Sequence, residues 1–289
     1  MLKYEIKKYI NNKVIILMFL GFLAMKVLVS YFSLNIDVDF GIDIYREYLE
    51  RWEGGLTDTK AAEIEAEHEY LNTIKQKYDS MMESFINGDI TFDEFDDCTK
   101  EYNLSEAKIR AFTPVYAKYR YFLKTDEKVE FYYDLEIMEF VNLLKQDFAL
   151  ILLVCFVVAF VYDLESRSDI SMVIRSLPEG RHRFERTKMG VALGFALICT
   201  ILFCGIDLIL YAYKYSFENW GGSIHSIMQF ARFPVNTDIY GTVAIMMGAK
   251  VIHSMLLVVG SAGIARATKR VFLTIFITSV IFMLPLVIG

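Results

Sequence analysis

Apolar runs separated by polar segments dominate the pattern of this chain. Four of the runs extend over roughly nineteen residues or more, about the length that an α-helix needs to cross the hydrocarbon core of a bilayer. A fifth run, residues 148–162, is shorter, and Val141 to Leu144 extend it towards the N-terminus. The sequence therefore predicts an all-α membrane protein with about five transmembrane helices. They are expected at residues 14–34, 148–162, 189–213, 241–265 and 271–289.

The first thirteen residues carry apolar side chains on one helical face and lysines around it. Leu2, Ile6 and Ile10 share the apolar face, a pattern typical of a helix lying on an anionic membrane surface. We therefore expect an interfacial amphipathic helix over residues 1–13. A cleavable signal peptide is the alternative, with cleavage near Ser30, but the apolar run continues past that residue.

Residues 35–147 form a polar block with helical periodicity. Two stretches place apolar residues at the intervals of a heptad seam, which is typical of helices packed along their length. Between them, Asn87 and Gly88 favour a left-handed helix end, and Thr91 with Glu94 has the sequence of a capping box. These features predict an antiparallel helical hairpin whose second arm is kinked at Pro114. The seam positions are Ile64, Leu71, Ile74, Tyr78, Met81 and Phe85, followed by Phe95, Tyr102, Ile109, Phe112, Tyr116, Tyr119 and Leu123.

Charge is distributed unevenly along the chain. The chain is 55% hydrophobic with a formal net charge of −6, and residues 35–147 contain 27 acidic and 13 basic residues, against 9 acidic and 17 basic residues elsewhere. Lysine and arginine next to spans mark the cytoplasmic side of a membrane. We therefore expect a protein of the plasma (cytoplasmic) membrane with a cytosolic N-terminus and residues 35–147 outside. An acidic block of this kind does not suit binding to a nucleic-acid backbone.

The segment 214–240, between the third and fourth spans, is expected on the same outer side. Ser223 can cap a short amphipathic helix that ends before Pro234. This helix is expected to lie at the membrane interface.

The loop 163–188, between the second and third spans, combines basic residues with a short apolar pattern. Apolar residues recur at helical spacing, and Pro178 with Gly180 ends the pattern. A short cytosolic helix is therefore expected within the loop. The residues of interest are Glu165, Ile170, Val173, Ile174, Arg175, Leu177, Pro178, Arg181 and Lys188.

The spacing of Glu165, Pro178, Arg181 and Lys188 resembles the loop of type-2 ATP-binding-cassette exporter permeases. Members of that family place a coupling helix between the second and third spans. Leu177 stands here where that family usually has Thr, and Asp169 where it usually has Gly. The resemblance implies that this loop would contact a separate ATPase subunit. The family has six spans per half, one more than the five expected here, so the resemblance implies either a shorter member of the family or a bundle that a partner completes.

Three charged residues fall inside the predicted spans: Lys26, Asp207 and Lys250. Their predicted depths from the outer span ends are similar, roughly 9 to 13 Å at the helical rise. Charges inside a bilayer usually face a bundle interior or pair with one another. We therefore expect a cluster in which Asp207 lies between the two lysines. Separate extension of each lysine to the membrane surface is the alternative.

Motifs for catalysis or metal binding are absent from the sequence. It contains no GxxxxGK phosphate loop, no GxSxG elbow and no pair of histidines at ligand spacing. We expect no catalytic residues, no metal and no cofactor. The resemblance then implies the membrane subunit of an ATP-driven exporter of peptides, lipids or drugs. Two permease subunits, alike or different, would work with ATP-binding-cassette ATPase subunits in the lipid membrane. The alternative is a membrane sensor or mechanotransmitter that binds an extracellular partner without transport.

Overall fold

The computed structural model describes residues 3, 6, 7, 11–125, 127–145, 147–166, 180–268 and 270–288, without the side chains of 163–166, 180–183 and 284–288. Within these residues the chain is mainly α-helical. Four stretches of the described chain are long and apolar enough to cross a membrane, which indicates a membrane-embedded protein. They are Lys13–Ser33, Leu135–Tyr162, Phe184–Lys214 and Ile239–Thr268.

The chain divides into two compact units. The first contains Met1–Asn35, Glu139–Ser216 and Val243–Gly289, and the second contains Ile36–Met138 and Phe217–Thr242. Each unit therefore gathers segments that are far apart in the sequence.

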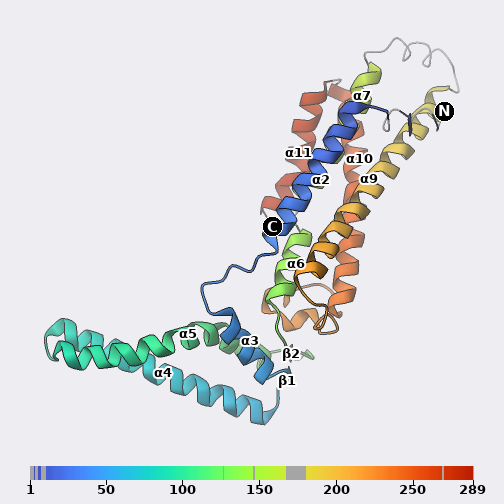
Figure 1. The fold of residues 1–289 in the computed structure, drawn as a ribbon. Helices are drawn as coiled ribbons and strands as arrows, with labels where there is room; N and C mark the ends of the chain where they lie inside the picture. Colours follow the sequence, from blue (N-terminus) through green and yellow to red (C-terminus); the bar gives the residue numbers. More distant parts are fainter. Residues whose placement is uncertain are drawn as a thin grey trace. The chain divides into compact units, whose positions relative to one another are not determined.

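The first unit is a bundle of apolar helices (Figure 1). Helix α7 packs against α2, α9 and α11, and α2 also packs against α9. Side chains from α7, α9 and α10 share one core, in which Leu153, Phe203 and Leu257 are fully covered. Asn12 caps the N-terminus of α2 by accepting from the backbone N–H groups of Val14 and Ile15. The helices that lie in this unit for all or most of their length are α2 (Lys13–Ser33), α6 (Leu135–Lys145), α7 (Phe148–Ser166), α9 (Gly180–Lys214), α10 (Ile239–Thr268) and α11 (Val271–Ile288).

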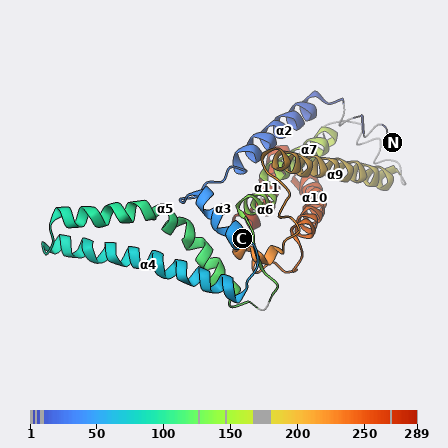
Figure 2. The same cartoon turned by 60° about the horizontal axis from the view of Figure 1, so that its bottom comes forward.

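The second unit is built around a long helical hairpin. Helices α4 (Asp58–Asn87) and α5 (Phe92–Phe122) lie side by side, as Figure 2 shows. Helix α3 (Ile42–Arg51) packs against α5. Strands β1 (Gly54–Gly55) and β2 (Glu130–Phe131) form a two-stranded antiparallel sheet, with Gly54 opposite Phe131. The hairpin expected from the sequence is present, and the small sheet is an addition that such short strands do not signal.

The hairpin turn has the local chemistry that its sequence predicts. Gly88 ends α4 with a φ of 79°, the left-handed region that favours glycine. Thr91 starts α5 with a complete capping box, in which the Thr91 hydroxyl accepts from the Glu94 N–H and the Glu94 carboxylate accepts from the Thr91 N–H. The hydrogen bonds that the Thr91 N–H and the Thr91 hydroxyl donate to the Glu94 carboxylate lower the pKa of Glu94. Pro114 lies inside α5 without ending it, and Figure 2 shows this helix bent towards its C-terminal end.

Aromatic pairs connect the two arms of the hairpin. The rings of Tyr78 and Tyr102 stack with centroids 4.1 Å apart, and those of Phe85 and Phe95 stack at 4.8 Å. His68 stacks on Tyr116 at 3.7 Å. The arms are therefore held along their length by side chains at the predicted seam positions and by His68.

A buried polar network lies in the second unit. The Lys118 ammonium is 2.8 Å from the Asp134 carboxylate, and the Tyr45 hydroxyl donates to the other Asp134 oxygen at 2.9 Å. All three side chains are buried. Burial, and then the negative charge of Asp134, raises the pKa of Tyr45 well above its ordinary value. Tyr45 therefore remains a hydrogen-bond donor over the whole neutral range.

Four sequence predictions differ from the described structure or lie partly outside it. In the segment 214–240, two short 3-10 turns, η1 (Ile224–Ser226) and η2 (Met228–Phe230), stand where an amphipathic α-helix is expected. Ser223 does cap the first turn, by accepting from the N–H of His225. The fifth predicted span corresponds to α11, whose described apolar part, Val271–Met283, is shorter than the other four. Most of residues 1–12 and the loop 167–179 lie outside the described residues.

Candidate functional site

Lys26, Asp207 and Lys250, the three charges predicted within spans, come together in the first unit. Nζ of Lys26 on α2 lies 2.9 Å from Oδ2 of Asp207 on α9, and Nζ of Lys250 on α10 lies 3.9 Å from the same oxygen. The Asp207 side chain is fully covered and that of Lys26 is 3% exposed. The expected arrangement, with the carboxylate between two ammonium groups, is the one the structure has.

A fourth charge, Asp147, completes this cluster. Its Oδ2 lies 3.1 Å from Nζ of Lys26 and 3.0 Å from Nζ of Lys250. Each ammonium therefore lies between two carboxylates, and the formal charges of the four groups cancel. We call these four residues the charge cluster.

Asp147 is not among the charges expected within the spans, although two features indicate its place in the cluster. Asp147 directly precedes α7, and its side chain accepts from the N–H of Leu150, as an N-cap residue does. Charge balance was the other signal: two lysines and one aspartate inside spans leave one positive charge without a counter-ion. Because an unbalanced charge in a low-dielectric interior is costly, a second carboxylate was to be expected.

Neighbouring side chains complete the environment of the cluster. The Ser30 hydroxyl donates to Oδ1 of Asp207 at 2.7 Å, while Oδ2 has the ion-pair contact with Lys26 and accepts no hydrogen bond from the described residues. The Lys26 ammonium also lies 6.0 Å from the centroid of the Phe203 ring. The cluster thus joins α2, α9, α10 and the start of α7 through one continuous polar contact.

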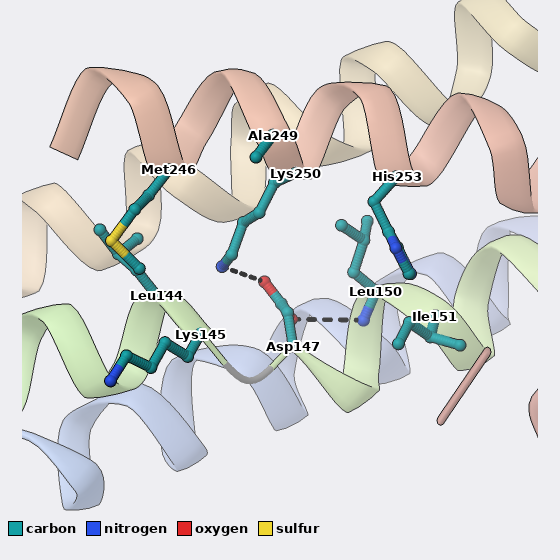
Figure 3. Close-up of a pocket in the computed structure, with 9 residues that line it drawn as sticks. All are labelled: Leu144, Lys145, Asp147, Leu150, Ile151, Met246, Ala249, Lys250 and His253. Carbon is teal, nitrogen blue, oxygen red and sulfur yellow. Dashed lines mark hydrogen bonds and ion pairs between the residues drawn. The ribbon is translucent and has the colours of Figure 1, made fainter. Parts of the chain in front are cut away.

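A pocket of about 280 Å³ adjoins the charge cluster. Figure 3 shows Asp147 and Lys250 pointing towards each other at its wall, with His253 one helical turn further along α10. Lys145 also lines it, and its Nζ lies 3.5 Å from Oδ1 of Asn142. Apolar side chains form the remaining walls: Leu144, Leu150, Ile151, Met246 and Ala249.

A second polar contact lies where the loop 163–188 meets the helices. The ammonium of Lys188, near the start of α9, is 3.5 Å from the centroid of the Tyr162 ring on α7. The Arg266 guanidinium of α10 lies 5.6 Å from the same ring and forms an ion pair with Glu185. Lys188 is 2% exposed, so the ends of three helices meet at a covered charge.

The remaining predicted coupling residues lie outside what the structure describes. Ile170, Val173, Ile174, Arg175, Leu177 and Pro178 are outside the described residues, and for Glu165 and Arg181 only the backbone is described. Of the predicted coupling set, Lys188 alone therefore has a described environment.

These sites can form ion pairs between side chains and can bind a small molecule. The charge cluster pairs charged side chains from α2, α9, α10 and the start of α7, and the pocket beside it has room for part of a small molecule. Within the described residues, no group of three or more His, Cys, Asp and Glu side chains could hold a metal ion. Comparison with protein-family models, with curated proteins and with solved structures finds no match to this chain.

Proposed function

We propose that this chain is the membrane-spanning subunit of an ATP-driven exporter. Two such subunits, alike or different, would bind separate ATP-binding-cassette ATPase subunits through the loop 163–188. The protein would lie in the plasma membrane with this loop in the cytosol and the hairpin of α4 and α5 outside. The loop resemblance and the basic residues beside the spans support this orientation.

The observation that carries the proposal is the contact of Lys188 and Arg266 with Tyr162. It links the ends of α7, α9 and α10 at the base of the proposed coupling loop. A force applied to the loop would therefore act on three helices together. Without this contact, the loop would act directly only on α7 and α9, the two helices that it connects.

The same helices lead from this contact to the charge cluster. Along α9, Lys188 and Asp207 are separated by about 28 Å at the helical rise, and along α10 Arg266 and Lys250 by about 24 Å. Rigid helices can carry a displacement over such distances. In the proposed mechanism, ATP-driven closure of the ATPase subunits moves the loop and rearranges the helices around the charge cluster.

The second candidate is a membrane sensor or mechanotransmitter. The observation that favours it is the exposure of large apolar side chains near the hairpin turn, where Ile86 is 72% and Phe92 65% exposed. Exposed apolar groups of this kind can mark an interaction site. In this alternative, the hairpin binds an extracellular partner and no molecule is transported.

Co-purification distinguishes the two candidates. The tagged chain would be extracted under conditions that preserve membrane complexes, and its partners identified by mass spectrometry. The exporter proposal predicts an ATPase subunit among them, retained about tenfold less by Arg175→Ala or Arg181→Ala, a loss typical of an interface hot spot. Arg120→Ala, an exposed position on α5, serves as the control and should retain the ATPase. Recovery of the intact chain without any ATPase subunit would favour the sensor.

A further inference from the structure

The pocket beside the charge cluster combines apolar walls with a few polar groups at one side. Leu150, Ile151 and Met246 form part of the apolar wall, while Lys250 and His253 contribute nitrogen atoms. Binding sites for small molecules usually have this composition, in which apolar area supplies affinity and a few polar groups fix orientation. A purely apolar guest would leave those nitrogens unused.

His253 provides a polar atom that the protein does not satisfy. Its Nε2 is covered and has no hydrogen-bond partner among the described residues. The ring is held edge-on to Phe282, with centroids 5.7 Å apart. A buried polar atom without a hydrogen-bond partner is destabilising. A ligand that forms a hydrogen bond with this nitrogen therefore gains affinity.

The charges around the pocket favour a negatively charged guest. The four members of the charge cluster are neutral in sum, and Lys145 adds a positive charge to the pocket lining. Asp147 is the carboxylate of the lining, and it already contacts two ammonium groups. Lys250, at 11% exposure of its side chain, is the least covered member of the cluster. The Lys250 ammonium has three N–H groups and donates one of them to Asp147, so it can also donate to an anion. The lining contains two lysines and one aspartate, and this excess of positive charge favours an anion over a cation.

We propose that this pocket binds the anionic end of an amphipathic molecule, a carboxylate or phosphate carried on an apolar chain. Lys250 pairs with the anionic group, His253 hydrogen-bonds to it, and the apolar walls cover the adjoining part of the chain. Binding requires neither nucleotide nor an ATPase subunit. It can therefore be tested, and can fail, independently of the proposed exporter.

The test measures binding of four probes with the same chain and different heads: dodecanoate, dodecyl phosphate, dodecanol and dodecyltrimethylammonium. The full-length protein is placed in phosphatidylcholine nanodiscs, and each probe is titrated while the midpoint of thermal unfolding is followed. At least one anionic probe is expected to raise the midpoint at about tenfold lower concentration than the neutral and cationic probes, because charge-assisted hydrogen bonds are worth about 1.5 kcal/mol or more. Dodecanoate and dodecyl phosphate distinguish a fatty acid from a phospholipid-derived ligand.

Two variants and a matched control test the location. Met246→Trp fills the pocket and should weaken anionic-probe binding at least about tenfold, while His253→Phe preserves the ring against Phe282 and should weaken it several-fold. Ile252→Trp adds the same bulk to α10 at a 63% exposed position and should leave binding unchanged. The proposal is overturned if neither anionic probe shifts the midpoint, if the cationic or neutral probe acts equally well, or if both pocket variants bind as the wild type does.

Discussion

Lys26 and Asp147 lie 121 positions apart in the sequence, yet Nζ of Lys26 is 3.1 Å from Oδ2 of Asp147. Both side chains are almost fully covered, at 3% and 7% exposure. Opposite charges buried in this way stabilise a structure only when each has a counter-ion, because taking a charge out of water is costly. The contact therefore ties the start of α7 to α2 and makes the cluster sensitive to the loss of any one charge.

Removing one carboxylate of the charge cluster should destabilise the protein severely. Asp147→Asn or Asp207→Asn leaves an excess ammonium among covered side chains, and the loss should be about 3 kcal/mol or more. It is measured as a lower midpoint of thermal unfolding and a lower yield of folded protein. For the exporter, Asp207→Asn should also impair transport.

A second substitution shows whether the excess charge causes this effect. Adding Lys250→Gln to Asp147→Asn restores neutrality, so the double variant should be more stable than Asp147→Asn alone. Asp79→Asn, at an exposed position on α4, removes a carboxylate without a comparable loss and serves as the control. Equal stability of Asp147→Asn and Asp79→Asn would contradict the role assigned to the cluster.

Lys188 and Tyr162 should be energetically coupled to each other. Because Lys188 also has other interactions, a double-mutant cycle with Lys188→Gln and Tyr162→Leu is needed to isolate the pair. A coupling energy of about 0.5 to 2 kcal/mol is expected for a cation over an aromatic ring that is largely out of water. A cycle of Arg186→Gln, an exposed position on α9, with Tyr162→Leu should show no coupling. Strict additivity in the first cycle would remove the observation on which the exporter proposal depends.

Tyr45 should stabilise the second unit in a pH-dependent way. Tyr45→Phe removes the hydrogen bond to Asp134 and should cost about 1 kcal/mol at neutral pH. Because the pKa of Tyr45 is raised in the folded protein, the folded state keeps a proton that the unfolded chain loses above about pH 10. Stability should therefore be fully present below that pH and fall as the pH rises further.

Hydrogen exchange of α3 and α5 in the full-length protein can measure this dependence. The loss of stability at alkaline pH should be smaller in Tyr45→Phe than in the wild type. Some loss should remain because burial also raises the pKa of Tyr132. Tyr70→Phe, at a 59% exposed position, should behave as the wild type does. Identical alkaline profiles for wild type and Tyr45→Phe would show that this hydroxyl does not contribute.

Gly88 should be required for the hairpin turn because of its backbone conformation. A Cβ at this position would meet no atom within 4 Å, so the cost of Gly88→Ala comes from the positive φ alone. That cost is about 1 kcal/mol, and it should appear as faster hydrogen exchange at the adjoining ends of α4 and α5. Gly55→Ala also meets open space, at a residue without a positive φ, and should leave exchange at the hairpin turn unchanged.

Features that depend on residues close together in the sequence could be predicted from the sequence alone. Helix length and apolar composition indicated the membrane-embedded stretches, because a helix satisfies its own backbone hydrogen bonds over about twenty residues. Gly88 and the Thr91–Glu94 capping box determined the hairpin turn, because left-handed backbone and helix caps are local chemistry. The similar depth of Lys26, Asp207 and Lys250 indicated a charge cluster, because buried charges need counter-ions.

Contacts between distant segments were decided by the tertiary structure. Asp147 joins the charge cluster because the packing of α2, α7 and α10 brings it close to both lysines. No periodicity in the sequence predicts these contacts. Likewise, the meeting of Lys188 and Arg266 at Tyr162, and the pocket containing His253, depend on how helices pack side by side. Local sequence determined which helices form and where charges enter them. Packing decided which charges meet, because many helix rotations satisfy the same apolar pattern and far fewer bring four charges into contact.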